Sequence, residues 1–228
     1  MTELVTYRLD DGVATVTLDD GKANVMSEHM LGAIAAALDR AEADRAVVLL
    51  TGRPRVFSAG YDLATFSRSA DDIRRTLRAG GDLVHRLLGF PYPVVAACQG
   101  HAIAQGAFTL LATDVRFGVT GDFKLGLNEV AIGLTIPHYG VELARHRLTA
   151  PGFDRAANTG MLVGPQEARE LGFLDVLAAD ADDLRTRATA EARRLTGIDF
   201  AAHAGTKLRV RAQVLAAVRS GIDAEFGE

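Results

Sequence analysis

Strand-like and helix-like patterns of apolar residues alternate along the start of the chain. Residues 5–9 and 13–18 alternate apolar and polar positions on either side of an Asp-Gly pair, which is typical of a β-hairpin. Residues 31–38 repeat apolar positions at helical spacing behind Ser27, a suitable N-cap. Residues 46–51 are almost entirely apolar, as in a buried strand. A hairpin, a helix and a strand in this order predict an α/β sheet.

The centre of the chain changes to short buried strands separated by turns. Residues 94–98 are small or β-branched and follow two prolines, which predicts a strand that residues 99–101 interrupt. Gln105 and Gly106 then open an apolar run at 107–112 that predicts a buried helix. A turn that feeds a helix leaves free N–H groups and a partial positive charge at the helix start. Such a turn can hold a negatively charged oxygen.

A second turn of this kind follows the predicted strand at 46–51. Its residues Ser58, Ala59 and Gly60 are small, so another group can approach the backbone closely. A lone acid, Glu129, lies downstream in a short polar island between apolar runs. Two turns with free N–H groups and one acid suit the activation of a carbonyl and the transfer of a proton.

The remainder of the chain is predicted to be mainly helical. Residues 63–89 fit a helical segment with one apolar face that Gly80-Gly81 interrupts. The remaining elements are predicted from the same kind of apolar spacing, and two of the helices have a proline near their first position. The predicted helices lie at 149–159, 165–171, 182–196 and 204–226, with a short strand at 176–178.

Composition narrows the class of protein. A chain of 228 residues with 48% hydrophobic and 24% charged residues can bury a sizeable core, as one large domain or one and a half. The net charge of −4 favours neither a nucleic acid nor an anionic membrane as a partner. The single cysteine, Cys98, forms no disulfide framework, and the six histidines show no metal-ligand spacing. With no leader pattern and no apolar run of ~18 residues, we expect a cytoplasmic protein.

A set of short motifs, in a fixed order over essentially the whole chain, resembles the crotonase superfamily, also called the enoyl-CoA hydratase/isomerase family. The motifs are Gly12–Leu18, Lys22-Ala23-Asn24, Phe57–Leu63, Gly100–Asp114, Leu125–Glu129 with Gly133 and Pro137, and Pro165–Ala168 before Leu171-Gly172. The resemblance implies an α/β fold, the crotonase (ClpP-like) spiral of ββα units, over residues 1–180. It implies a C-terminal helical trimerisation region over 181–228 and a homotrimer or a dimer of trimers. The implied substrate is an acyl-CoA thioester, with no separate cofactor and no metal.

The resemblance also assigns roles to residues. It implies that the backbone N–H groups of Tyr61 and Gln105 bind the thioester oxygen, although the family usually has glycine at position 105 and often at 104. The other residues at which it implies contacts with substrate or CoA are Lys22, Ala23, Asn24, Ser58, Ala59, Gly60, Asp62, Gly106, Phe108, Tyr139 and Lys207. Simpler roles are open for several of these: a helix N-cap for Asp62, packing for Tyr139 and a solvated helix face for Lys207.

Phe108 and Glu129 decide which reaction the resemblance favours. Hydratases of the family use two glutamates, and the first of these positions holds Phe108 here, whereas the second matches Glu129. Adding water to a double bond needs two proton-transferring groups, whereas moving the bond from C3 to C2 needs one. We therefore expect a Δ3,Δ2-enoyl-CoA isomerase. The alternatives are an enoyl-CoA hydratase, with Tyr139 as the best candidate for a second acid, and a non-catalytic acyl-CoA-binding paralogue.

Overall fold

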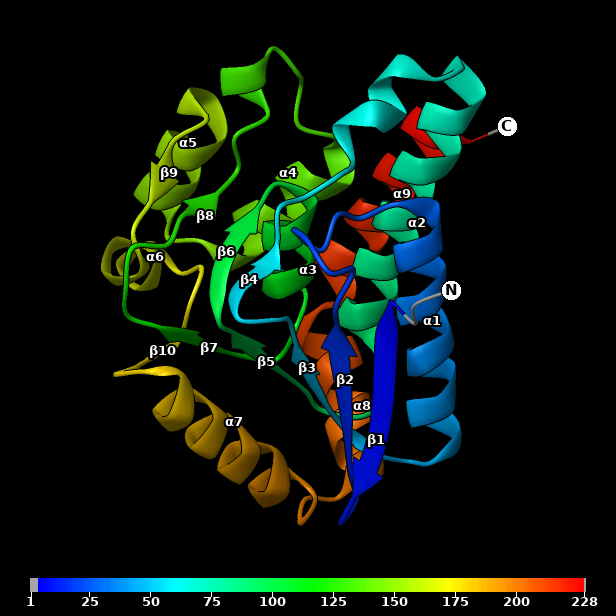
Figure 1. The fold of residues 1–228 in the computed structure, drawn as a ribbon. Coiled ribbons are helices and arrows are strands. Elements are labelled where there is room, and N and C mark those ends of the chain that lie inside the picture. The colour runs from blue at the N-terminus through cyan, green and yellow to red at the C-terminus, as the bar shows by residue number, and fades with distance from the viewer. Residues whose placement is uncertain (1–3, 228) are drawn as a thin grey trace.

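The computed structural model describes residues 4–227, and the strands in this part of the chain form two sheets (Figure 1). The larger sheet contains, in spatial order, β1 (Val5–Asp10), β2 (Val13–Leu18), β3 (Val47–Thr51), β5 (Val94–Cys98), β7 (Val115–Val119) and β10 (Val176–Ala178). The smaller sheet contains β4 (Arg55–Ser58), β6 (Gly100–Ile103), β8 (Leu125–Gly126) and β9 (Leu162–Val163). All pairs are parallel except β1 with β2 and β8 with β9.

Helices connect and cover these strands. They are α1 (Glu28–Ala43), α2 (Ala70–Gly89), α3 (Gln105–Leu111), α4 (His138–Arg147), α5 (Ala150–Thr159), α6 (Pro165–Leu171), α7 (Ala181–Leu195), α8 (Phe200–Val210) and α9 (Ala212–Phe226), with the 3-10 turns η1 (Leu63–Ser67) and η2 (Val130–Ile132). The predicted hairpin and the predicted N-cap are confirmed: the Ser27 hydroxyl accepts a hydrogen bond from the Met30 amide. The predicted α/β architecture is therefore confirmed.

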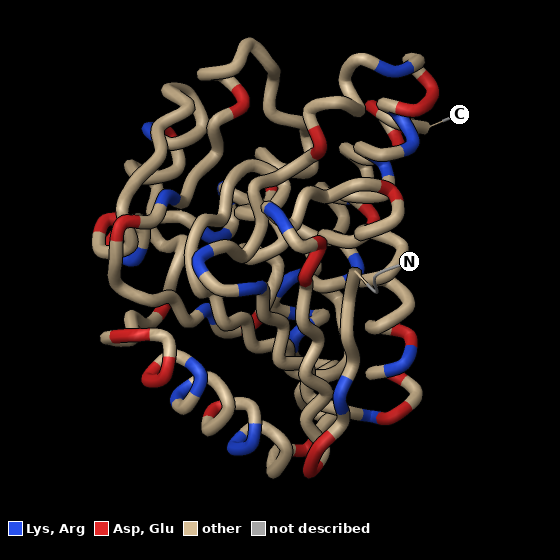
Figure 2. Tube along the Cα trace, in the orientation of Figure 1, with Lys and Arg blue, Asp and Glu red and all other residues tan. Residues whose placement is uncertain are grey.

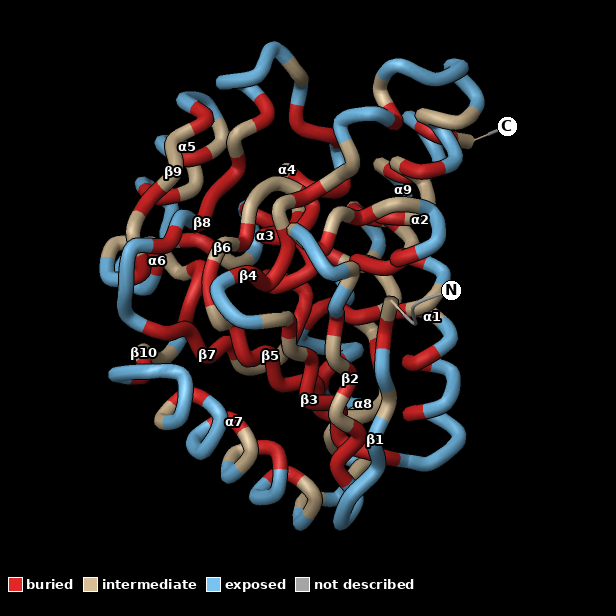
Figure 3. Tube along the Cα trace, viewed as in Figure 1, coloured by how far each residue is buried: buried red, intermediate tan, exposed pale blue. Residues whose placement is uncertain are grey.

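Alternation along the strands sorts the side chains onto the two faces of the larger sheet. Val48 and Leu50 belong to a large core on the α1 side, whereas Val47 and Leu49 belong to a smaller cluster that α7 covers. The predicted apolar face of α7 forms the other half of that cluster. Figure 3 shows the buried strands between the exposed outer turns of α1 and α7. Figure 2 shows charges of both signs interspersed along α7, so this helix presents no single-sign surface.

Three details differ from the prediction. Helix α2 continues through Gly80 and Gly81, because these glycines serve close packing and do not interrupt the helix. The predicted helix 204–226 is wrong as one element: it begins at Phe200 and divides at Arg211 into α8 and α9. Residues 99–101 do end a strand, but Gly100 starts a new one, β6, in the smaller sheet. The interruption marks the place where the chain passes from one sheet to the other.

The C-terminal helix contributes side chains to the same core cluster as the larger sheet. Helix α9 packs against α2 and α4, and its buried residues belong to the large core cluster. These residues are Val214, Val218, Ile222 and Phe226. Figure 1 shows α9 beside α2, so residues more than a hundred positions apart in the sequence cover one side of the molecule together.

Candidate active site

The two glycine-containing turns lie against each other. Strands β4 and β6 pair in the smaller sheet, which aligns Ser58 with Ala102. A Cβ added at Gly60 would lie 2.8 Å from the Ile103 carbonyl oxygen and 3.5 Å from the Gln105 amide nitrogen, and a Cβ at Gly106 would overlap with the Ser58 carbonyl oxygen. Only glycine allows the two backbones to approach this closely. The sequence prediction that both turns serve one site is consistent with this packing.

Each turn offers one of the predicted amide donors. Gln105 is the first residue of α3, where an N–H group has no partner within the helix. Across residues 4–227, neither the Tyr61 amide nor the Gln105 amide donates to a protein acceptor. Ala104, directly before the second donor, has φ 50° and ψ −120°, a conformation that suits glycine better than alanine. The backbone therefore keeps the sharp turn although the side chain makes it costly.

Glu129 lies between β8 and η2 with its side chain directed into the protein. The residue is only 6% exposed, and its Oε2 atom is buried with no hydrogen-bond partner among the described residues. Burial raises the pKa of the Glu129 carboxyl from 4.5 to about 7, against a smaller opposing effect of its own backbone N–H. Burial is therefore the cause of the raised pKa of Glu129. A buried, unpaired carboxyl of this kind is a candidate proton-transfer group.

Two tyrosine hydroxyls lie within reach of this charge. Burial, together with the charge of Glu129, raises the pKa of Tyr61, and the same two causes act on Tyr139. The Tyr139 side chain is fully buried, and its hydroxyl lies 2.8 Å from that of Tyr61. The charge of Glu129 thus acts on two hydroxyls that are hydrogen-bonded toward the donor turns, which makes this acid and the two turns candidates for one site.

Comparison with known proteins shows to which family the chain belongs. The chain matches the family model described as enoyl-CoA hydratase/isomerase over residues 8–226. The chain belongs to the enoyl-CoA hydratase/isomerase family. One relative of this family, a putative enoyl-CoA hydratase of Thermus thermophilus, is 37% identical over 190 residues, which cover 78% of this chain and 73% of the relative.

Solved structures of the family share the fold. A Pseudomonas syringae enoyl-CoA hydratase/isomerase family protein superposes with a TM-score of 0.95 at 44% identity, covering 98% of this chain and 96% of that one. An enoyl-CoA isomerase of Mycobacterium tuberculosis superposes with a TM-score of 0.95 at 39% identity and covers 100% of both chains. The expected crotonase fold is therefore confirmed. The family acts on acyl-CoA thioesters, and names for both reactions occur among these relatives.

In this member of the enoyl-CoA hydratase/isomerase family, the residues expected near CoA mainly form hydrogen bonds with the backbone of neighbouring loops. Asn24 is fully buried and donates from Nδ2 to the carbonyl oxygens of Leu18 and Phe57 at 2.9 and 3.1 Å. Ser58 donates to the Asn24 carbonyl oxygen, and the Ala59 amide donates to that of Ala23. Lys22 is exposed. Contact of this backbone with CoA stays a prediction.

Two further candidates have the simpler of their proposed roles. Asp62 caps η1 by accepting a hydrogen bond from the Ala64 amide at 3.0 Å, as the N-cap alternative predicted. Phe108 is fully buried in α3, and its ring lies edge-on to Tyr139 with 5.8 Å between centroids. The position at which hydratases of the family carry a glutamate is thus part of the apolar core.

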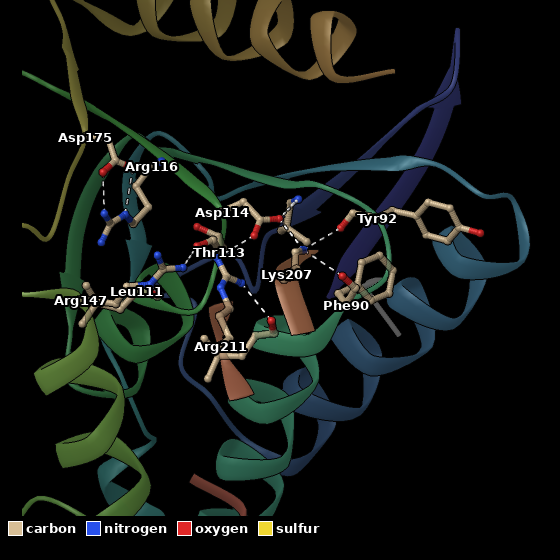
Figure 4. Close-up of polar contacts among 12 residues, drawn as sticks. Phe90, Tyr92, Leu111, Thr113, Asp114, Arg116, Arg147, Asp175, Lys207 and Arg211 are labelled. Carbon is tan, nitrogen blue, oxygen red and sulfur yellow. Dashed lines mark hydrogen bonds and ion pairs between the residues drawn. The ribbon is translucent and has the colours of Figure 1, made fainter. Parts of the chain in front are cut away.

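Lys207 requires a correction, because its side chain is buried and does not lie on a solvated helix face. Its ammonium donates to the carbonyl oxygens of Phe90 and Tyr92 and to Asp114, as Figure 4 shows, so all three N–H donors are used. Arg211 binds the second oxygen of Asp114 at 2.8 Å. Burial lowers the pKa of Lys207 to about 8, against the opposing charge of Asp114. No local pattern indicates this burial, because lysines on a C-terminal helix are usually exposed.

One polar residue beside Glu129 was not singled out from the sequence. Asn128 has a buried Oδ1 atom with no partner in the described part of the chain. It belongs to the polar island that drew attention to Glu129, so the signal was present in the pattern. A side chain with a free buried oxygen beside the candidate base can meet a polar group of a ligand or a water molecule.

Two surface hollows contain neither donor turn nor Glu129. One, of about 460 Å³, is lined by Asp114 and by residues of α8 and the loop before it, and the other, of about 610 Å³, is lined by α2 arginines near Asp223. Glu129 and the two donor turns remain the candidate site because they combine a buried carboxyl with free amides. Within residues 4–227, no three His, Cys, Asp or Glu side chains are arranged to hold a metal ion. None of the described helices is long and apolar enough to cross a membrane.

Proposed function

We propose that the protein isomerises a 3-enoyl-CoA to a 2-enoyl-CoA. The amides of Tyr61 and Gln105 bind the thioester oxygen, and the Glu129 carboxylate removes a proton from C2. The C–H electron pair moves into the thioester, which becomes a dienolate with its negative charge on the bound oxygen. Glu129 then returns the proton at C4, and the double bond moves to C2–C3. Every proton and electron pair is balanced within the substrate and one carboxyl group.

The observation that carries this proposal is the buried carboxyl of Glu129, the only Asp or Glu that is buried among residues 4–227. Glu129 is 6% exposed, and its pKa of about 7 has burial as its only raising cause. A base is most effective when its pKa lies near the working pH, because it is then both ionised and basic enough. Phe108, which replaces the other glutamate of the hydratases, can neither accept nor release a proton. The M. tuberculosis protein that is similar over its whole length carries both names, enoyl-CoA isomerase for one structure and probable enoyl-CoA hydratase for another, so the choice between the reactions rests on Glu129 and Phe108.

Hydration of a 2-enoyl-CoA is the second candidate, and the name of the T. thermophilus relative favours it. It needs a second proton-transferring group beside Glu129. The sequence offered Tyr139 for this role, but the hydroxyl of Tyr139 is fully buried and donates to Gln105 Oε1 at 2.8 Å. Its single proton is therefore engaged, which makes it a poor acid for a substrate.

The proposal is tested with two substrates. Purified protein is offered 3-enoyl-CoA and 2-enoyl-CoA, while conjugation of the thioester and addition of water are followed by absorbance. We expect turnover of the first substrate and none of the second. Hydration of 2-enoyl-CoA at a comparable rate would replace this proposal by the second candidate. Binding of both without turnover would identify a non-catalytic acyl-CoA-binding protein.

For the assembly we propose a homotrimer or a dimer of trimers, as the family resemblance implies. Apolar side chains on α8 and η2 support an interface, because they are about half exposed in the single chain. Leu208 and Val210 are 52% and 69% exposed, and Val130 and Ile132 are 45% and 47% exposed. Sedimentation velocity tests this proposal, and a monomer at micromolar concentration would contradict it.

A further inference from the structure

The side chains of the two proposed oxyanion donors are joined to each other through a third residue. The Tyr61 hydroxyl lies 2.8 Å from the Tyr139 hydroxyl, which donates to Gln105 Oε1 at 2.8 Å. Gln105 Nε2 in turn donates to the Gly80 carbonyl oxygen of α2 at 3.0 Å. A chain of hydrogen bonds thus runs from Tyr61 through Tyr139 and Gln105 to α2. We call these three residues and Gly80 the tyrosine–glutamine bridge.

Counting protons gives the bridge a fixed direction. Gln105 Nε2 faces a carbonyl oxygen, so its Oε1 must face Tyr139, and Tyr139 must donate there. Tyr139 has a single hydroxyl proton, so Tyr61 is the donor in the 2.8 Å contact between the two tyrosines, and the Leu77 carbonyl oxygen of α2 is a longer second acceptor for the same proton at 3.4 Å. A buried hydrogen-bond network of this kind rigidifies the groups that it joins.

The surrounding packing fits the bridge closely. Gln105 and Tyr139 are both fully buried. A Cβ at Gly80 would overlap with the Tyr61 hydroxyl, and a Cβ at Gly81 would lie 3.1 Å from Tyr139 Cδ1. The ring of Tyr139 also lies between the rings of Phe108 and Phe226, at 5.8 and 6.3 Å between centroids. The paired glycines of α2 make room for the bridge, which explains why they occur inside a helix.

We propose that Tyr139 is a positioning residue that fixes the spacing and direction of the Tyr61 and Gln105 amides. This role rests on the proposed function, because it concerns the donors that bind the thioester oxygen. Donor direction matters because the amides act on charge that develops in the transition state, and each must already point to it. The side chain of Gln105 therefore anchors this turn to Tyr139 and to α2.

The variant Tyr139→Phe tests the role, because it removes one hydroxyl and keeps the ring that packs in the core. We expect kcat for 3-enoyl-CoA to fall about tenfold to a hundredfold, less than the loss of a whole donor, while KM changes less than about threefold. Phe226→Leu is the matched control, since it loosens the packing on the same ring and leaves the bridge intact. It should lower stability and leave kcat within about twofold.

A double-mutant cycle adds a readout that a purely structural role would not move. Tyr61→Phe and Tyr139→Phe each cut the same contact, so the double variant should lose little more activity than either single one. Gln105→Met keeps the amide and removes the side-chain link, and it should reproduce the loss of kcat if Tyr139→Phe does not fold. Fully multiplicative losses in the cycle would overturn the proposal.

The carbonyl stretch of a bound, ¹³C-labelled saturated acyl-CoA reports on the donors without turnover. Binding to the wild type should lower the stretching frequency, and Tyr139→Phe should remove part of that shift, because its donors are less well aimed. An unchanged shift together with unchanged kcat would overturn the positioning role while leaving the isomerase proposal intact. A wild type that shows the shift but turns over no enoyl-CoA would overturn the proposed reaction and not the positioning of the amides.

Discussion

At the scale of single residues, Glu129 destabilises the fold at the pH where it can act as a base. Its pKa is raised from 4.5 to about 7 in the folded protein. Between these values the folded chain keeps a proton that the unfolded chain has released, so the free energy of unfolding falls as the pH rises. The difference corresponds to roughly 3 kcal/mol at pH values above 7.

Glu129→Gln should therefore raise stability in a pH-dependent way. We expect the variant to be roughly 3 kcal/mol more stable than the wild type in mildly alkaline buffer, and about equally stable near the unfolded pKa of 4.5. Urea unfolding at both pH values measures this. A gain that is the same at both would show that the carboxyl does not titrate as its burial implies.

Ala104 is the second residue whose backbone opposes its side chain. Its φ of 50° is unfavourable for alanine and free of cost for glycine. We expect Ala104→Gly to raise the free energy of unfolding by about 1 kcal/mol. Ala36→Gly, at an exposed position within α1, is the control and should lower it by about the same amount. Equal losses for both variants would show that the turn carries no strain.

Local patterns in the sequence indicated the two turns and the polar island of Glu129, but they did not indicate the burial of Lys207 or the contacts of Tyr139. The donor turns at 61 and 105 follow from glycine and strand patterns, which are local. The burial of Lys207 depends on carbonyl oxygens of residues 90 and 92, far away along the chain. The bridge through Tyr139 likewise spans residues 61–139 and leaves no periodic signal.

At the scale of elements, a glycine in α1 and a glycine in α2 show where close packing outweighs helix propensity. Alanine is favoured over glycine inside a helix by about 1 kcal/mol. Gly32 in α1 has no atom within 4 Å of an added Cβ, so Gly32→Ala should stabilise the protein by about this amount. Gly80→Ala should instead destabilise it by about 1–3 kcal/mol, because the Cβ would overlap with the Tyr61 hydroxyl.

Thermal unfolding of these two variants, with kcat for 3-enoyl-CoA, checks the comparison. Gly80→Ala should lower both Tm and kcat, since it disturbs the bridge, whereas Gly32→Ala should raise Tm alone. If both changes stabilised the protein, α2 would not pack closely against the tyrosine–glutamine bridge.

Most elements were predictable because their signals are local. The hairpin, α1, α7 and the proline-started helices α5 and α6 follow from caps and periodicity. The two-residue strands β8 and β9 carry too little pattern to be recognised. The division between α8 and α9 was missed because Arg211, at the break, is held by the Leu88 carbonyl oxygen and Asp114. Such anchoring is a tertiary effect.

At the scale of the whole molecule, a buried ionic cluster attaches the C-terminal helices to the core. Asp114, directly before β7, binds both Lys207 and Arg211, and Arg116 binds Asp175 nearby (Figure 4). The side chains of Lys207 and Arg211 are 4% and 8% exposed. Two buried cations therefore depend on one carboxylate. Losing one partner of such a group leaves uncompensated charge in the interior.

Asp114→Asn should therefore lower the free energy of unfolding by about 3–5 kcal/mol in urea titrations. Asp39→Asn removes the same charge from an ion pair with Arg86 in which Asp39 is 72% exposed. That control should change stability by less than about 1 kcal/mol. A small effect for both variants would show that α8 and α9 are held by apolar packing alone.

The overall architecture was predictable in kind, because alternating strand and helix signals indicate an α/β sheet and the ordered motifs indicate the family. The division into two sheets and the return of α9 onto α2 came only from the structure. These arrangements depend on contacts between distant segments, which no local pattern encodes.

The central claim is that one buried carboxyl transfers the proton of an enoyl-CoA. It is tested most directly by measuring kcat/KM for 3-enoyl-CoA from about pH 5 to about pH 9 in the wild type and Glu129→Gln. The wild-type rate should rise with pH through about 7 and then level off, as the carboxylate forms. The variant should lose about 10²–10⁴-fold at every pH. A variant that keeps the wild-type rate and pH profile would contradict the account.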